Sequence, residues 1–212
     1  MIRLIMVRHG QTIWNREKRY QGQSDTPLDE TGIAQAAALA GYFTGQAVDH
    51  IYSSDLQRAW RTALPIGLAV GVTPVSEPRL REGSFGEWEG LTYDEINRRW
   101  PGELAAWLAD PITRVPPAGE TLERIMSRLG SVLDLIRERH DGQTVMVVSH
   151  GGALRAMVLY ALGLPSPAFW RLSLGSAAVS EMRLYPDVSV LTLFNDTHVV
   201  SHIPASPWVG RS

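Results

Sequence analysis

Short apolar segments alternate along the chain with longer segments of helical character. Six apolar runs predict β-strands, over residues 2–7, 48–52, 72–75, 144–149, 178–185 and 188–194. Helices are expected over residues 31–42, 121–139 and 153–162, and after positions 54, 92 and 101. Such an alternation of strands and helices is typical of an α/β fold with a largely parallel sheet. The last two strands are separated by Pro186 and Asp187 and predict a hairpin.

The helix expected over residues 121–139 has the clearest pattern. Its apolar residues form a single stripe, made of Leu122, Ile125, Met126, Leu129, Val132, Leu133 and Ile136. A stripe of this kind marks a helix that packs one face against a core.

Local polar residues predict where three other helices begin. Ser54 with Gln57, and Thr92 with Glu95, each form a capping-box pattern before a helical segment. Pro101 is expected in the first turn of the following helix, where its missing N–H costs nothing.

Length and composition narrow the class of protein. The 212 residues are expected to form one domain, over 1–212, with a core of its own. The chain has no cysteine, which excludes thiolate catalysis, cysteine-ligated metals and disulfide scaffolds. A net charge of −2 predicts no nucleic-acid partner, and no apolar run is long enough for a membrane helix. We therefore expect a soluble, cytoplasmic protein.

Two histidines stand at the ends of two predicted strands. Residues 4–7 are followed by Arg8, His9 and Gly10, and residues 145–148 by Ser149, His150, Gly151 and Gly152. Ligands of open α/β sheets bind at the carboxyl ends of the strands. If the two strands are parallel neighbours, both imidazoles reach one edge of the sheet, where glycine backbone N–H groups can approach an anion.

Two arginines indicate that the anion is phosphate. Arg8 precedes the first histidine, and Arg58 lies early on the helix that follows the second strand. Guanidinium groups bind phosphate through two parallel hydrogen bonds and keep their charge at any working pH. No phosphate-binding glycine loop or clustered metal-ligand pattern competes for this role in the sequence.

In such a pocket the best nucleophile of a chain without cysteine is an imidazole. Attack of His9 on phosphorus would divide phosphoryl transfer into a phosphohistidine step and a hydrolysis step. The leaving alkoxide then needs a proton, which a carboxylic acid usually supplies. Glu82 is the candidate acid, although Glu87 and Glu89 share its loop and the residues alone do not choose among the three.

An ordered set of motifs resembles the histidine phosphatase superfamily, in its phosphoglycerate-mutase-like branch. The set covers nearly the whole chain and consists of residues 8–12 (RHGQT), 14–15, 20–22, 53–59 (SSDLQRA), 62–63, 80–82 (LRE), 85–90 (FGEWEG), 119–121 and 148–152 (VSHGG). The resemblance implies a three-layer sandwich, in which helices flank a mostly parallel central sheet, and it implies catalysis without a metal or other cofactor.

The resemblance also implies roles for individual residues. His9 would be the phosphorylated nucleophile and Glu82 the proton donor. Arg8, Arg58 and His150 would bind the phosphate and belong to the catalytic set. Substrate contacts are further expected from Gly151, beside the second histidine, and from the rim residues Asn15, Gln21 and Gly22.

Phosphatase activity is favoured over phosphoglycerate mutase activity. Mutases of the family have a tyrosine where this chain has Phe85, and the later pair Arg98 and Arg99 lies on a predicted helix. The run from Phe85 to Gly90 and the segment 193–198 resemble the phosphatases of the α-ribazole phosphatase and metal-independent phosphoserine phosphatase type. We expect hydrolysis of small phosphorylated metabolites. The alternatives are a phosphoglycerate mutase and a catalytically silent phosphate-binding regulatory protein.

Several other residues are given a plainer interpretation. His50, His140, His198 and His202 are expected to be ordinary exposed histidines, and Arg155 is open between substrate contact and a solvated or ion-paired role. Tyr93, Trp100 and Trp107 are expected in the core, with a lid over the substrate as the alternative. The expected partner is a small phosphomonoester, and self-association as a homodimer is left open.

Overall fold

The computed structural model describes residues 1–203, so the end of the predicted domain, residues 204–212, lies outside the described residues. Six strands form one sheet in the order β3-β2-β4-β1-β5-β6. Their bounds are Ile2–Arg8 (β1), His50–Ser53 (β2), Val75–Ser76 (β3), Thr144–Ser149 (β4), Val179–Leu184 (β5) and Ser189–Asp196 (β6). The first four strands in chain order pair in parallel, and the β5–β6 hairpin joins β1 antiparallel. The predicted mostly parallel sheet is therefore confirmed.

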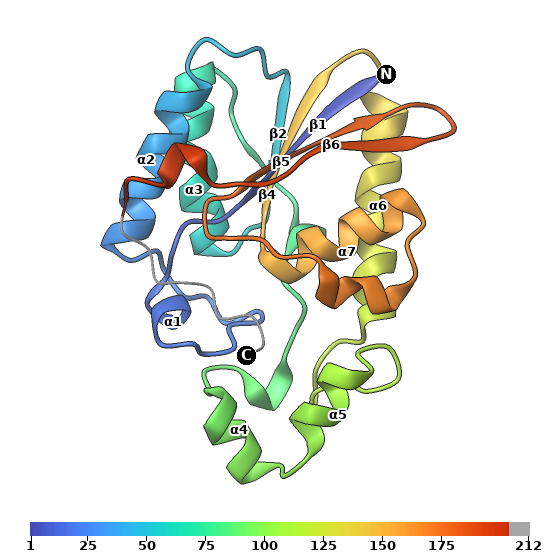
Figure 1. The fold of residues 1–212 in the computed structure, drawn as a ribbon. Coiled ribbons are helices and arrows are strands. Elements are labelled where there is room, and N and C mark those ends of the chain that lie inside the picture. The colour runs from blue at the N-terminus through green and yellow to red at the C-terminus, as the bar shows by residue number, and fades with distance from the viewer. Residues whose placement is uncertain (204–212) are drawn as a thin grey trace.

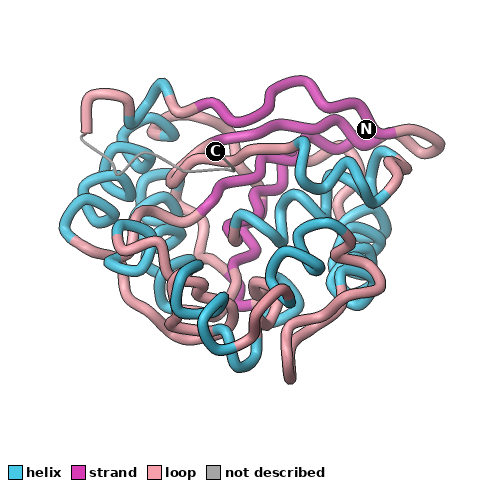
Figure 2. Tube along the Cα trace, turned by 60° about the horizontal axis from the view of Figure 1, so that its bottom comes forward, coloured by secondary structure: helices cyan, strands magenta, loops and turns pink. Residues whose placement is uncertain are grey.

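Helices cover both faces of this sheet, as Figures 1 and 2 show. One layer contains α2 (Glu30–Phe43) and α3 (Gln57–Val70), and the other contains α6 (Leu122–Arg139) and α7 (Gly151–Leu162). No helix among residues 1–203 combines the length and the apolar character that a membrane crossing requires. The three layers confirm the predicted sandwich.

The alternation of side chains along the central strands divides the core in two. On one face, Leu4 and Met6 of β1 pack in the cluster that contains the buried stripe of α6 and most of α7. On the other face, Ile5 and Val7 pack in the cluster that contains Leu39 of α2 and residues of α3. A strand buried on both faces has to be apolar throughout, which is why β1 reads as a continuous apolar run.

A smaller helical layer lies beyond the carboxyl ends of the parallel strands, at the bottom of Figure 1. It contains α4 (Tyr93–Arg99) and α5 (Glu103–Ala109), which follow the short 3-10 turns Pro78–Leu80 and Gly86–Trp88. A third core cluster holds this layer together and is made of Trp88, Ile96, Leu104 and Trp107. The remaining short elements are α1 (Ile13–Arg16) and the 3-10 turns Ser166–Arg171 and His198–Val200.

Two of the predicted helix starts are wrong. Helix α3 begins after Leu56, an N-cap that makes no side-chain capping bond. The predicted box of Ser54 and Gln57 does not form, because the Ser54 hydroxyl bonds His150 and the Gln57 side chain bonds Asp25. Pro101 precedes α5, whose N-cap is Gly102 at a φ of 83°. The capping box of Thr92 and Glu95 is present as predicted at the start of α4.

The loop that carries His9 packs against α2 through a close contact between the two backbones. A Cβ on Gly32 would lie 2.0 Å from the Gln11 carbonyl oxygen, and one on Gly10 would lie 2.6 Å from the Gly32 carbonyl oxygen. Real Cβ atoms do not approach oxygen so closely, so both positions require glycine. The position of His9 thus depends on how closely this loop packs against α2.

We predict that Gly32→Ala lowers the free energy of unfolding by about 2 kcal/mol or more, because the new methyl group forces the loop away from α2. Gly41→Ala is the matched control on the same helix, since no atom lies within 4 Å of its added Cβ. It should raise the free energy of unfolding by about 0.5–1 kcal/mol, as expected for glycine replaced in a helix. Chemical denaturation measures both, and equal effects of the two variants would contradict the contact.

Candidate active site

His9 and His150 meet at the carboxyl edge of the sheet, as predicted from the ends of their strands. The parallel register pairs Arg8 with Ser149, and the N–H of His9 donates to the Ser149 carbonyl at 2.9 Å. The two imidazole centroids are consequently 5.1 Å apart. Both residues are buried, at 3% and 0% exposure.

The hydrogen bonds of His9 define which ring nitrogen can react. Its Nδ1 lies 2.7 Å from the Gly10 carbonyl oxygen, and a carbonyl can only accept. Nδ1 therefore carries the proton, and Nε2 keeps its lone pair. No hydrogen bond to Nε2 is found among the described residues. His9 thus has the tautomer that a nitrogen nucleophile needs.

His150 is fixed by hydrogen bonds at both ring nitrogens. The Arg58 Nε–H donates to its Nδ1 at 3.1 Å, so the proton of the neutral ring is on Nε2, which lies 2.8 Å from the Ser54 hydroxyl. Arg58 also donates to the carbonyl oxygens of Ser24 and Gly22, both at 2.7 Å. His150 and Arg58 therefore form one rigid unit beside His9.

The cations of the site have no carboxylate partner. Among residues 1–203, no ion pair within 4.0 Å involves Arg8 or Arg58. Arg8 donates to the Leu174 carbonyl at 2.5 Å, and its buried Nε has no hydrogen-bond partner in the described part of the chain. Burial lowers the pKa of Arg8 and lowers that of Arg58 to about 10. Both remain charged at neutral pH, so the site favours an anion.

Both histidines are held neutral by their surroundings. Burial, together with the positive charge of Arg58, lowers the pKa of His9 and of His150 well below the ordinary value of 6.5. Arg8 adds to the effect at both rings. A neutral imidazole is the nucleophilic form, so the pocket that attracts an anion also keeps His9 reactive.

Glu82 lies at the start of α7, beside the two histidines. Its carboxylate accepts hydrogen bonds from the backbone N–H groups of Gly152 and Ala153, each at 2.8 Å. A Cβ on Gly152 would approach Glu82 Oε1 to 2.5 Å, so a side chain there would displace the carboxylate. Gly151 makes room in the same way for Arg8, whose Nε lies 3.3 Å from its virtual Cβ.

The other two glutamates of the loop have different surroundings. Glu87 is exposed. Glu89 accepts hydrogen bonds from the backbone of Gln23 and of Phe85 and from the Ser24 hydroxyl, and so braces the loop. Of the three, only Glu82 is bound to the helix that follows His150.

The predicted rim residues are connected through Thr12. Its hydroxyl lies 3.0 Å from Asn15 Oδ1 and 3.0 Å from Gln21 Oε1. Gly22, at a φ of 52°, supplies one of the carbonyl oxygens that hold Arg58. Asn15, Gln21 and Gly22 therefore belong to one connected segment, which adjoins Arg58.

Three supporting residues were not predicted as site residues. Ser54 bonds His150, the Thr62 hydroxyl accepts the Gly10 N–H at 3.1 Å, and Arg128 donates to the carbonyl oxygens of residues 79, 81 and 82. Thr62 lies within a motif of the resemblance, but Arg128 has no local signal, since it appears only as a polar residue of a long helix. Among residues 1–203, no group of three or more histidine or acidic side chains is placed to hold a metal ion.

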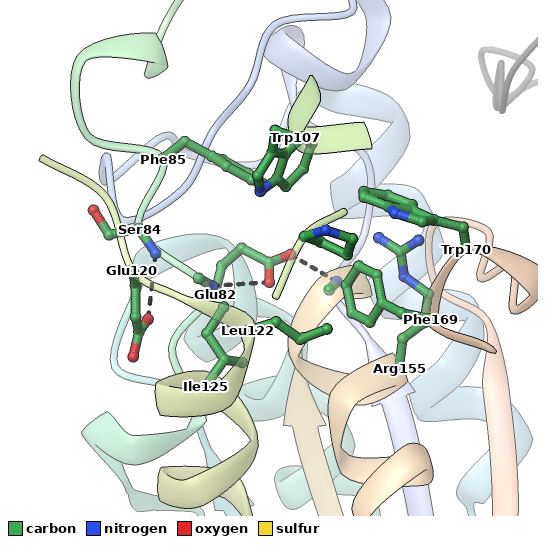
Figure 3. A pocket seen from close by; sticks show the side chains of 13 residues that line it. Glu82, Ser84, Phe85, Trp107, Glu120, Leu122, Ile125, Arg155, Phe169 and Trp170 are labelled. Carbon is green, nitrogen blue, oxygen red and sulfur yellow. Dashed lines mark hydrogen bonds between the residues drawn. The ribbon is translucent and has the colours of Figure 1, made fainter. Parts of the chain in front are cut away.

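An aromatic pocket opens on the Glu82 side of the histidines (Figure 3). Its walls include Phe85, Trp107, Phe169 and Trp170, and Arg155 reaches into it from α7. The Arg155 guanidinium lies 4.3 Å from the Phe169 ring centroid, and no ion pair of this residue is present among the described residues. The ion-paired alternative for Arg155 is therefore not seen in the described part of the chain, and contact with the substrate stays a prediction.

The expected aromatic group does not form one unit. Trp107 is buried and lines the pocket, and Trp100 packs at the edge of the same core cluster. Tyr93 instead has 48% of its surface exposed. Only Trp107 is therefore placed to contact a substrate.

One of the histidines expected at the surface is buried. His140 has 5% exposure, and its Nε2 lies 2.8 Å from the Tyr52 hydroxyl. Its ring packs 4.2 Å from that of His50, which is partly buried. His198 and His202 are exposed as predicted.

Comparison with known proteins finds similar sequences and similar structures for this chain. A sequence model of the histidine phosphatase superfamily (branch 1) matches residues 4–197. Phosphoserine phosphatase 1 of Hydrogenobacter thermophilus is 35% identical over 93% of each chain. Probable phosphoglycerate mutase GpmB of Yersinia pestis is 38% identical over 86% of this chain and 85% of its own. The structure of a mycobacterial glucosyl-3-phosphoglycerate phosphatase is similar at a TM-score of 0.85 and 33% identity, over 92% of this chain and 99% of that one.

The lowered histidine pKa values predict how stability depends on pH. Below pH 6.5, the ordinary pKa of histidine, His9 and His150 bind protons in the unfolded chain but stay neutral in the folded protein. The contribution of these two histidines to the free energy of unfolding should therefore be fully present above pH 6.5. It should be lost as the pH drops toward their lower pKa values in the folded protein. His9→Gln removes one of these groups and should reduce the loss.

The measurement is chemical denaturation of the parent and the variant at about pH 7.5 and about pH 5.5. His198→Gln, at an exposed position, is the matched control. If His9→Gln and His198→Gln lose the same stability on acidification, His9 is not held neutral by burial.

Proposed function

The chain belongs to the histidine phosphatase superfamily, branch 1, and is a phosphatase; on that premise we propose that it hydrolyses small phosphorylated metabolites through a phosphohistidine on His9. The observation that carries the proposal is the free Nε2 of His9, which lies among buried arginines that lack a carboxylate partner. A phosphate dianion supplies the negative charge that Arg8 and Arg58 lack as a partner. Bidentate hydrogen bonds from the guanidinium groups would orient it.

The first step forms a bond between Nε2 of His9 and phosphorus and breaks the bond between phosphorus and the ester oxygen. The electron pair of that bond leaves with the alcohol, which takes a proton from Glu82 in its protonated state. The Gly10 carbonyl, which accepts from Nδ1 at 2.7 Å, stabilises the positive charge that develops on the ring. Arg8 and Arg58 neutralise the phosphoryl oxygens through the transfer.

The second step returns the enzyme to its starting state. Glu82, now a carboxylate, takes a proton from a water molecule, whose oxygen attacks the phosphorus of the phosphohistidine. The bond between Nε2 and phosphorus breaks, and inorganic phosphate leaves. The same atoms thus serve both half-reactions, with Glu82 as acid in the first and base in the second.

Phosphatase rather than mutase activity is supported by the surroundings of the pocket. Phe85 lines it at the position where mutases of the family have a tyrosine. Arg98 and Arg99 are exposed on α4 and do not line it, so they do not bind a phosphoglycerate there. An assay of phosphoglycerate isomerisation with and without bisphosphoglycerate distinguishes the two activities, and dominant isomerisation would favour the mutase alternative.

We predict that His9→Ala abolishes hydrolysis of a generic aryl phosphate, because the neighbouring imidazole, His150, has both ring nitrogens hydrogen-bonded and cannot replace the free Nε2 of His9. The parent should keep its activity in excess EDTA, because the proposed steps use no metal. Turnover by the variant comparable to that of the parent would contradict the phosphohistidine route. Loss of parent activity on chelation would contradict catalysis without a metal.

We predict that the damage caused by Glu82→Gln depends on the leaving group. Aryl oxygens with low pKa leave without protonation, so activated aryl esters should lose much less kcat than alkyl esters, which need the acid. The measurement is kcat across a series of aryl and alkyl phosphates for the parent and the variant. Equal losses across the series would remove Glu82 from the role of proton donor.

A further inference from the structure

Arg155 is a half-buried cation that the proposed chemistry does not use. It lies on α7, one helical turn after Gly152, whose N–H holds Glu82, so both side chains face the same pocket. Its Nε–H donates to the Gly151 carbonyl at 3.2 Å. Its two terminal nitrogens have no hydrogen-bond or ion-pair partner among residues 1–203. A guanidinium that faces a pocket in this state offers a two-pronged donor site for an anion.

Two aromatic rings fix the direction of this donor site. The guanidinium carbon lies 4.3 Å from the centroid of Phe169 and 5.2 Å from that of Trp170. Stacking of this kind uses the faces of the guanidinium plane and leaves its edge available for hydrogen bonds. In Figure 3 the terminal nitrogens lie beside Trp170, on the side of the pocket opposite Phe85. The site is thus preorganised, because little side-chain freedom is lost when an anion binds.

The pocket also fixes which part of a substrate Arg155 meets. Glu82, which would protonate the departing alcohol, lines the same pocket, whereas His9 does not. The pocket therefore holds the alcohol portion of the ester, and Arg155 and Glu82 meet it at different points. No ion pair joins these two side chains in the described residues. Desolvation lowers the pKa of Arg155 to about 10, and the nearby Glu82 carboxylate only partly opposes this effect.

We propose, on the basis of the proposed phosphatase function, that Arg155 determines specificity by binding a carboxylate on the alcohol portion of the substrate. The preferred substrates are then phosphate esters of hydroxy acids. The pocket walls are mainly apolar, and the Glu120 carboxylate, which also lines them, is paired with Arg128 at 2.9 Å. A single guanidinium in this pocket matches a monoanion, whereas a second phosphate would bring more negative charge than one arginine neutralises. The aromatic walls exclude water and so strengthen the ion pair.

Two pairs of esters that differ mainly in the carboxylate provide the test. They are 3-phosphoglycerate against glycerol 3-phosphate, and O-phosphoserine against O-phosphoethanolamine. The parent should prefer the acid of each pair by about tenfold or more in kcat/KM, as expected for a charge-assisted hydrogen bond made in a desolvated site. In Arg155→Gln the preference should fall to near unity, chiefly through a higher KM for the acids.

Arg171→Gln is the matched control, because this arginine ends the same 3-10 turn as Trp170 but is exposed and outside the pocket. It should keep the preference of the parent. If Arg155→Gln does not fold, Arg155→Lys replaces it and should show a reduced preference, since it keeps the charge without the two-pronged geometry. A purely structural role of Arg155 would lower the activity on all four esters and leave the ratios unchanged.

The outcomes separate this inference from the function on which it rests. Hydrolysis that requires His9 but shows no preference for the acids, or a preference that persists in the Arg155 variants, would overturn the role of Arg155 alone. Hydrolysis that does not require His9 would instead overturn the proposed function. A collapse of both ratios in the Arg155 variants, with the Arg171 control unchanged, supports the carboxylate site.

Discussion

The parallel pairing of β1 with β4 sets the geometry of everything that follows it along the chain. The register places Arg8 beside Ser149, and the next residue of each strand is therefore a histidine at the same edge of the sheet. Because both strands are buried on both faces, a slip by one residue would turn every side chain of a strand into the wrong core cluster. The apolar contacts of the two faces thus also fix the 5.1 Å separation of the imidazoles.

The electrostatics of the site follow from the burial of arginines that form no ion pair among the described residues. Proteins usually pair buried arginines with carboxylates, but here carbonyl oxygens and one imidazole accept the hydrogen bonds of Arg8 and Arg58. This arrangement leaves positive charge for a phosphate and at the same time lowers the pKa of His9. Burial is the main cause of the low His9 pKa, and the cations that favour an anion reinforce it. Arg155, which is half-buried, also forms no ion pair among the described residues, and it lines the same pocket as Glu82.

Sequence patterns predict the parts of this structure that depend on local or periodic interactions. The stripe of α6 and the apolar run of β1 indicate their burial directly, and an arginine and a histidine after such a strand indicate a ligand site. The spacing of Ser54 and Gln57 predicts a capping box, whereas the Ser54 hydroxyl bonds the Leu56 N–H and the ring of His150, which is far along the chain. His140 is buried for a similar reason, since its contact with Tyr52 joins two distant segments. Residue spacing also did not distinguish Glu82 from Glu89; the hydrogen bonds to α7 do, and those require the fold.

The central claim is that phosphorus is transferred to Nε2 of His9, and trapping the intermediate tests it most directly. The enzyme would be mixed with an activated aryl phosphate, quenched within milliseconds by alkaline denaturant, and examined by intact and peptide mass spectrometry. The account predicts one added phosphoryl group, located on His9, stable in alkali and lost in acid, which forms as fast as the aryl alcohol is released. A phosphoryl group on another residue, or rapid release of the alcohol with no phosphorylated enzyme under conditions where its hydrolysis is slow, would contradict the account.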